Sequence, residues 1–321
     1  MKNYLDNFIK CMTYNSPEVI PVSVNILPSV YKKYAEDASR IFQKFEHFFD
    51  DDEINFDYEN ALPRTYKTGT YIDEWGCVWE NIHEGQGSYV TGHPIKTREQ
   101  IRTLTEPTEI DDALGHSFMF LRLIDLRGYE EAMIDFAEEA PELSILISAV
   151  LSYNLKVVEK QLSKPTGPIF YCGDDLGTQI GLPISKEHWM KYLFDGFRQI
   201  FGAVKAHNKY VYFHTDGKIT NIMPEIKRAG ADMINPQIGA NPIDELAEVC
   251  KGKIPINLGL DRQLIPFMSP KDIDDHIKES ISKMYLKEGG LGITLEIAED
   301  FSLETINACL TSLERHRFYT A

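Results

Sequence analysis

The chain has 321 residues, of which 43% are hydrophobic and 26% are charged, a balance typical of a globular protein and not of disordered or fibrous ones. Its formal net charge is −16, from 33 Lys and Arg against 49 Asp and Glu. An acidic surface opposes binding to phosphate backbones and anionic lipids. We therefore expect neither nucleic acid nor a membrane as partner.

The amino-terminal half contains three candidate strands, which are short runs rich in β-branched or aromatic residues. These runs cover residues 19–26, 70–79 and 117–122. Between the first two, an amphipathic stretch from residue 35 to 50 and a polar segment to residue 64 are interpreted as an insertion.

From about residue 167 short apolar runs alternate with longer stretches of helical period, the pattern of βαβ units in a parallel sheet. The predicted strands cover residues 168–171, 210–213, 232–235, 254–258 and 291–295. With the three earlier candidates this gives about eight strands, the number that a closed (β/α)8 TIM barrel requires. The expected fold class is therefore an α/β barrel that forms a single domain over residues 1–321.

The five cysteines are widely spaced and include no Cys-x-x-Cys pair, so they indicate neither a disulfide framework nor a zinc knuckle. No uninterrupted apolar run approaches the roughly 18 residues of a membrane span. The first residues lack the apolar core of a secretory signal. These features predict a cytoplasmic protein.

Polar residues follow the predicted strands, where the loops of a barrel carry its catalytic groups. We expect six of them to lie in one pocket at the barrel mouth: Asp73, Asp174, His214, Gln237, Asp261 and Glu296. Five other histidines, at positions 83, 93, 116, 188 and 207, are interpreted as surface or packing residues.

His214 and Asp216 lie two positions apart, so at an extended strand end both side chains point to the same face. Imidazole nitrogen and carboxylate oxygen both bind zinc, which makes the pair a candidate metal site. The alternative is that Asp216 caps the following helix while His214 lines the barrel. Both interpretations stay open.

Two further groups of residues have a functional and a structural interpretation. Asp174 and Asp175 are adjacent, so only one is expected to meet substrate, as an acid or base, and either is equally a turn residue. Asp73 lies beside Trp75 and Trp79, and such an aromatic wall with a carboxylate suits a planar or cationic ligand. For Trp79 packing is the preferred interpretation.

Six short motifs occur in an order that resembles the uroporphyrinogen decarboxylase superfamily: residues 73–79, 92–95, 174–179, 213–217, 235–237 and 259–261. The resemblance covers most of the chain and implies a (β/α)8 barrel. Decarboxylases of this superfamily use no cofactor and grip propionates with arginines. Its corrinoid and coenzyme M methyltransferases use zinc held by a His-x-Cys pair and a later cysteine.

The chain differs from both branches at these positions. No arginine occurs from Pro21 to Tyr34, where the decarboxylases grip propionate. Asp216 stands where the methyltransferases have their first zinc cysteine, and the region of the second contains Glu296. Oxygen ligands favour zinc less strongly over other divalent metals than thiolates do.

The resemblance therefore implies first a methyltransferase-like enzyme that acts on a small methylated substrate, with a corrinoid carried by a partner protein. Zinc or another divalent metal would be held by His214, Asp216 and Glu296. The expected catalytic residues are His214, Asp174, Asp73 and Asp261, and the expected substrate-binding residues are Trp75, Gln179, Gln237 and Arg262. The alternatives are a metal-free decarboxylase-type lyase and a non-catalytic tetrapyrrole- or corrinoid-binding barrel. A homodimer is left open.

The missing arginines lead to a first prediction, which concerns uroporphyrinogen itself. Each propionate that enters a closed cleft without a cationic partner carries a desolvation penalty of order several kcal/mol. We expect the purified protein not to decarboxylate uroporphyrinogen at a useful rate. Chromatography of the porphyrins after incubation checks this, and conversion to coproporphyrinogen at a metabolic rate would refute it.

Overall fold

The computed structural model describes residues 2–49 and 51–320. The chain divides into two compact units, each made of segments that are distant in sequence. Unit 1 comprises residues 1–69, 81–89 and 237–321, and unit 2 comprises residues 70–80 and 90–236. That residues 1–321 form a single domain stays a prediction.

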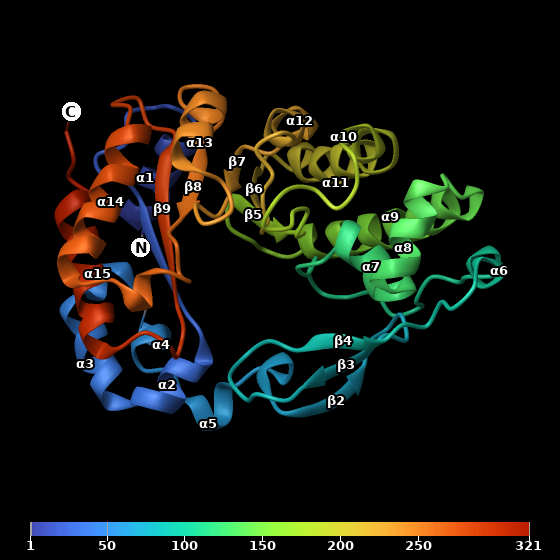
Figure 1. Cartoon of the computed structure of the whole chain (residues 1–321), viewed down its shortest axis with the longest axis horizontal. Helices are drawn as coiled ribbons and strands as arrows, with labels where there is room; N and C mark the ends of the chain where they lie inside the picture. Colours follow the sequence, from blue (N-terminus) through green and yellow to red (C-terminus); the bar gives the residue numbers. More distant parts are fainter. Residues whose placement is uncertain (1, 50, 321) are drawn as a thin grey trace. The chain divides into compact units, whose positions relative to one another are not determined.

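Unit 1 contains three parallel strands in the order β1 (Val22–Ile26), β9 (Leu291–Ile297) and β8 (Ile256–Gly259). Segments from the amino-terminal and carboxyl-terminal parts of the chain pair here, since Val22 pairs with Ile293 (Figure 1). β9 is buried along nearly its whole length, as expected for an inner strand of a parallel sheet. Helices α14 (Pro270–Met284) and α15 (Leu303–His316) pack against each other.

The other elements of unit 1 are short. They are α1 (Lys2–Met12), α2 (Pro28–Tyr34), α3 (Glu36–Lys44), η1 (Glu46–Phe48), α4 (Asp51–Ile54), α5 (Tyr58–Ala61), η2 (Arg64–Tyr66), α13 (Ile243–Cys250) and η4 (Ile265–Phe267). The amphipathic stretch that the sequence placed at residues 35–50 is helical over α3, which buries Ala38 and Phe42.

Unit 2 contains three parallel strands in the order β5 (Ile169–Gly173), β6 (Tyr210–His214) and β7 (Met233–Asn235). A smaller sheet, which lies mostly within this unit, has the order β2 (Gly69–Ile72), β3 (Val78–Asn81) and β4 (Tyr89–Gly92). The helices of unit 2 are α6 (Arg98–Arg102), α7 (Phe120–Arg127), α8 (Tyr129–Ala137), α9 (Pro141–Leu162), α10 (Lys186–His188), the π-helix η3 (Trp189–Leu193), α11 (Phe194–Ala206) and α12 (Met223–Ala229).

The α/β class and the five strands predicted for the carboxyl-terminal half are confirmed, as is the strand predicted at residues 19–26. The strand predicted at residues 117–122 is wrong, because α7 begins at Phe120. Residues 70–79 contribute to β2 and β3 of the smaller sheet, joined by a turn in which Asp73 N–H donates to the Cys77 carbonyl. Six strands with parallel neighbours, rather than eight, are found among the described residues, so a complete (β/α)8 TIM barrel is not confirmed.

Helix α9 is, within residues 2–49 and 51–320, the one helix long and apolar enough to cross a membrane, with 22 residues and a mean hydropathy of 1.2. Half of its most apolar stretch is buried inside the protein. It contacts α6, α7, α8 and α11 of the same unit. The helix therefore packs among the other helices of unit 2, and the cytoplasmic location stays a prediction.

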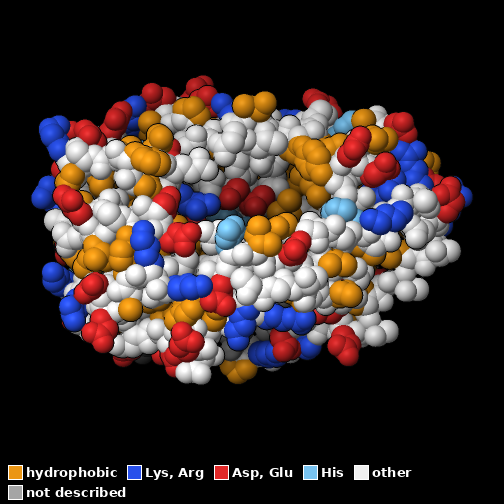
Figure 2. All heavy atoms as spheres, turned by 60° about the horizontal axis from the view of Figure 1, so that its bottom comes forward, with side chains coloured by type: hydrophobic (Ala, Val, Ile, Leu, Met, Phe, Trp, Pro, Cys, Tyr) orange, Lys and Arg blue, Asp and Glu red, His pale blue; other side chains and the backbone are white. Residues whose placement is uncertain are grey.

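Acidic and basic side chains are interspersed over the face of the molecule shown in Figure 2. Many form exposed pairs, such as Lys156 with Glu106 and Arg198 with Asp195, both at 2.6 Å. Exposed pairs of this kind contribute only about 0–1 kcal/mol each. The absence of a nucleic-acid partner stays a prediction.

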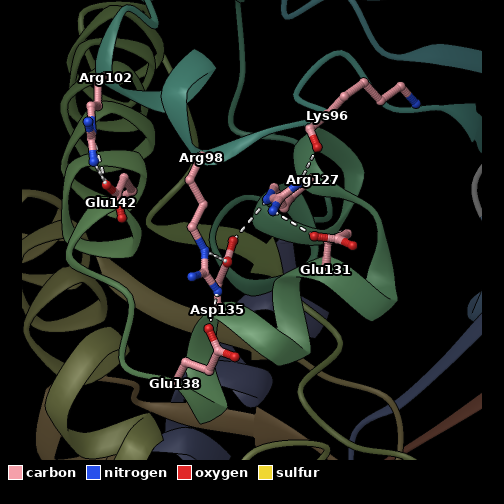
Figure 3. A network of polar contacts seen from close by, with 8 residues as sticks. All are labelled: Lys96, Arg98, Arg102, Arg127, Glu131, Asp135, Glu138 and Glu142. Carbon is pink, nitrogen blue, oxygen red and sulfur yellow. Dashed lines mark hydrogen bonds and ion pairs between the residues drawn. The ribbon is translucent and has the colours of Figure 1, made fainter.

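A buried ion-pair network holds the helices of unit 2 together (Figure 3). The Asp135 side chain on α8 is 1% exposed and accepts from Arg98 Nε at 2.7 Å and from Arg127 Nε at 2.9 Å. Arg127, which is also buried, donates to the Lys96 carbonyl and pairs with Glu131. Each buried charge thus has a partner. If one charge were removed, another would remain buried without a partner, which is strongly destabilising.

We expect Asp135→Ala to lower the free energy of unfolding by about 3–5 kcal/mol, because it leaves the Arg127 guanidinium buried with an unpaired donor. Urea unfolding followed by circular dichroism measures the change. The matched control is Glu138→Ala, which removes an exposed partner of Arg98 and should cost less than about 1 kcal/mol. Equal effects of the two variants would contradict the prediction.

Candidate functional site

The ends of β5, β6 and β7 place three residues side by side in unit 2. The register pairs Gly173 with His214 and His214 with Asn235. His214 Nδ1 lies 2.7 Å from Asn235 Oδ1, and because an amide oxygen only accepts, Nδ1 carries the proton. The other ring nitrogen, Nε2, lies 3.1 Å from Asp216 Oδ1. The sequence interpretation that places His214 and Asp216 on one face is therefore consistent with the geometry.

His116 and Asp175 complete a cluster around this histidine. His116 Nε2 lies 3.1 Å from Asp175 Oδ2, and Asp175 Oδ1 lies 4.0 Å from His214 Nε2. One candidate ligand atom of each residue lies within 4.8 Å of the other two. We call His116, Asp175 and His214 the two-histidine cluster. Their side chains are 45%, 28% and 35% exposed, so a ligand can reach them.

The position of His116 depends on a glycine at the end of β5. A bridge joins His116 to Gly173, and Ser117 N–H donates to the Gly173 carbonyl at 3.0 Å. A Cβ at Gly173 would lie 2.5 Å from His116 Nδ1, closer than atoms can approach. The missing side chain therefore makes room for the imidazole beside β5.

Asp174 holds the start of α7. Its buried carboxylate accepts from Phe120 N at 2.5 Å and from Leu121 N at 3.0 Å. Burial raises the pKa of Asp174 to about 7, against the opposing effect of the two backbone N–H groups. The two neighbouring aspartates thus differ in role, since Asp174 anchors a helix and Asp175 faces the histidines. A catalytic role for Asp174 stays a prediction.

The charges of the cluster stabilise one another. Burial alone would lower the pKa of His214, but contacts with Asp216, Asn235 and Asp175 outweigh it and raise the pKa to about 9. Burial likewise would raise the pKa of Asp175, but its hydrogen bond and charge interaction with His116 lower it. The cluster therefore combines cationic and anionic groups that hold each other in place.

Asp73 is held in the turn between β2 and β3. Its Oδ1 accepts from Trp75 N at 3.0 Å and Cys77 N at 2.8 Å, while Oδ2 accepts from Trp79 Nε1 at 2.9 Å and Arg122 Nη1 at 2.6 Å. All four donors come from unit 2. The carboxylate therefore organises the turn, and its predicted catalytic role stays a prediction.

Trp75 contributes to packing. Its side chain is buried, and its ring meets Tyr153 edge-on with the centroids 5.2 Å apart. Gln179 is exposed in the loop after β5. Substrate contact by either residue stays a prediction.

Unit 1 holds a second group of the predicted residues, after β8 and in β9. Asp261 Oδ1 accepts from the backbone N–H of Gln263 and Leu264, each at 3.1 Å. Arg262 Nε lies 3.2 Å from Glu296 Oε1, and Gln237 forms an isolated bridge to Gly259. The predicted residues are thus divided between the two units. That all of them line one pocket stays a prediction.

Three comparisons place this chain among known proteins. No family model matches it, and no curated protein matches it in sequence. Among solved structures it is similar to a methyltransferase from Methanosarcina mazei, with a TM-score of 0.66 and 12% identity over 97% of this chain and 98% of the other. A dihydropteroate synthase from Xanthomonas albilineans, with 4-aminobenzoic acid, matches over 65% of this chain and 68% of the other at 13% identity. Its TM-score of 0.34 bears on neither fold nor function.

The likeness supports an α/β fold with a parallel sheet, whereas the complete (β/α)8 barrel that the motif order implies is not confirmed. This chain shares the fold of the Methanosarcina methyltransferase over nearly its whole length. At 12% identity the likeness concerns the fold, so the reaction has to be argued from the residues of the site.

Sequence reasoning missed two members of the cluster for identifiable reasons. The wrong strand at residues 117–122 put His116 before a strand, at the end of a barrel that carries no catalytic loops. Asp175 was not separated from Asp174, because alternation tells which faces two neighbours point to but not which face holds the site. The signal available in the sequence was the position of His116, a polar side chain just before the apolar run in which α7 begins.

We expect Asp174→Asn to lower the free energy of unfolding by about 1–3 kcal/mol, because one amide oxygen cannot accept as two carboxylate oxygens do. Hydrogen exchange should show the amides of Phe120 and Leu121 losing protection. As a control, Asp57→Asn replaces the exposed cap of α5 with an equally good cap residue and should change stability by less than about 0.5 kcal/mol. Unchanged protection at the start of α7 would contradict the anchoring role.

Proposed function

We propose that this chain is a metal-assisted, methyltransferase-like enzyme that acts on a small methylated substrate. The observation that carries the proposal is the two-histidine cluster of His116, Asp175 and His214. The likeness in fold to a methyltransferase supports the reaction class. Zinc or another divalent cation would be held by the cluster.

The residues present fit such a metal in donor chemistry. Two imidazole nitrogens and a carboxylate suit zinc and other transition metals. Ligand atoms bound at about 2.0–2.2 Å around a tetrahedral ion lie roughly 3.5 Å apart. His116 Nε2 lies 3.1 Å from Asp175 Oδ2, and His214 Nε2 lies 4.0 Å from Asp175 Oδ1, which are comparable separations. His214 donates its Nδ1–H to Asn235, as metal-binding histidines usually do to a neighbouring oxygen.

A bound metal would act as a Lewis acid on the heteroatom that carries the methyl group. The chain's own residues hold the surroundings of that reaction. Asn235 fixes the His214 ring with Nε2 toward the cluster, and Asp216 N–H donates to Asp175 Oδ1 at 2.9 Å. Asp216 Oδ1 is buried, close to His214 Nε2. It is placed to accept a proton from a donor that enters the site.

This ligand set differs from the one inferred from the sequence alone. Asp216 stays next to His214, but Glu296 belongs to unit 1 and pairs with Arg262. We propose His116 and Asp175 as ligands in its place. The methyl acceptor would be a corrinoid carried by a partner protein, as the superfamily resemblance implies.

A second candidate is a metal-free lyase of the decarboxylase type. It is favoured by the contact of 3.1 Å between His214 Nε2 and Asp216 Oδ1, with Asn235 on the opposite ring nitrogen. A histidine held in this way can donate a proton to a carbanion left by decarboxylation. The metal content of the protein distinguishes the two candidates.

The test is metal analysis of protein purified without chelator, followed by zinc titration. We expect one divalent ion per chain, and at least about tenfold weaker binding in His116→Ala and Asp175→Asn. Gly173→Ala should weaken binding as well, because its Cβ would displace His116, whereas Gly167→Ala adds a Cβ with nothing within 4 Å and should not.

Two outcomes would contradict this proposal. If the folded wild-type protein binds no divalent metal, the lyase becomes the better candidate. If Glu296→Ala abolishes binding while His116→Ala leaves it unchanged, the metal has the ligands inferred from the sequence. Thermal unfolding of each variant shows whether a loss of metal reflects a loss of fold.

A further inference from the structure

Arg122 is a cation of unit 2 that neither the sequence motifs nor the cluster accounts for. It lies in the first turn of α7, the turn whose backbone N–H groups Asp174 holds. Its side chain is 17% exposed. The helix start that positions His116 therefore also positions a largely enclosed guanidinium.

Among the residues that the structure describes, Arg122 makes its hydrogen bonds through one nitrogen, Nη1. That nitrogen donates to Asp73 Oδ2 at 2.6 Å and lies 3.9 Å from Cys77 Sγ. The opposite edge of the guanidinium, formed by Nε and Nη2, has no acceptor in the described part of the chain. Two parallel N–H groups on such an edge match the two oxygens of a carboxylate.

Asp73 does not need Arg122 to keep its turn. It already accepts from two backbone N–H groups and from Trp79 Nε1. These three donors partly neutralise the negative charge of Asp73. The positive charge of the Arg122 guanidinium is therefore only partly compensated by Asp73, and it can still attract the anionic group of a ligand. Asp73 thus fixes Arg122 through Nη1, while Nε and Nη2 can donate to a ligand. A binding group held in this way is preorganised.

Arg122 and the two-histidine cluster share an acidic neighbour. Asp125 Oδ2 lies 3.9 Å from Arg122 Nη1 and is buried without a hydrogen-bond partner among the described residues. Burial raises the pKa of Asp125 to about 6, while the charges of Arg122 and His116 both oppose the rise. Geometry also links Arg122 to the cluster, because α7 begins at Phe120, between His116 and Arg122, and its first N–H groups donate to Asp174, the neighbour of Asp175.

We propose that Arg122 binds a carboxylate of the substrate through its Nε and Nη2 edge, so that the enzyme acts on small methylated organic acids. The inference rests on the proposed function, for which it names the substrate class. Arg122 selects and orients the anion. The cluster lies at the reacting heteroatom.

The experiment uses benzoate and benzamide, which share shape and differ in charge. Calorimetric titrations are made on the wild-type protein with and without zinc. We expect benzoate to bind at least about tenfold more tightly than benzamide. Arg122→Gln should remove the preference, and Arg122→Lys, which keeps the charge but loses the two-pronged edge, should retain only part of it. Arg198→Gln, an exposed arginine of the same unit, is the control and should keep it.

A benzoate preference that survives in folded Arg122→Gln would overturn the inference, and so would a wild-type protein that binds neither compound at tens of millimolar. Metal content is measured on the same samples. If the protein contains no metal but prefers benzoate to benzamide through Arg122, the metal-assisted reaction is refuted and the anion site is supported. Bound metal with no preference refutes only the anion site.

Discussion

The fully buried carboxylate of Asp174 holds the start of α7 against the end of β5, and the arrangement of the site in unit 2 follows from this contact. The residues it joins are 54 positions apart in the chain, Phe120 and Asp174. A carboxylate taken out of water has to be satisfied by donors, and two backbone N–H groups at a helix start supply them. The same contact brings His116 to Asp175 and places Arg122 in the first helical turn.

The chemistry of the cluster differs from the thiolate sites of the methyltransferases that the sequence resembles. In the proposed metal site, imidazole and carboxylate ligands would select among divalent metals less sharply than cysteines do, and three protein ligands would leave a fourth position for a substrate heteroatom. The neighbouring groups are fixed by hydrogen bonds, from His214 Nδ1–H to Asn235 Oδ1 and from the Asp216 backbone N–H to Asp175 Oδ1. Such support keeps a site in one geometry before its ligand arrives.

Unit 2 combines this polar site with a second set of buried charges around Asp135 and Arg127. That network ties α8 to the end of α7 and to α6, so the helix that begins at the site also ends in a fixed position (Figure 3). A helix held at both ends can carry functional side chains with little freedom. The cost is that removal of one charge leaves another buried and unpaired.

The sequence by itself determined the α/β class, six of the strands and the polarity at the strand ends, because β-branched runs and helical spacing are local patterns. It also singled out His214 and Asp216, which share one strand end. The tertiary structure alone decided that residues 117–122 lead into a helix, that Asp175 rather than Asp174 faces the histidines, and that His116 joins them. The physical reason is that these three outcomes depend on contacts between segments far apart in the chain: a short apolar run fits a strand or a helix equally well until a distant carboxylate accepts its first backbone N–H groups.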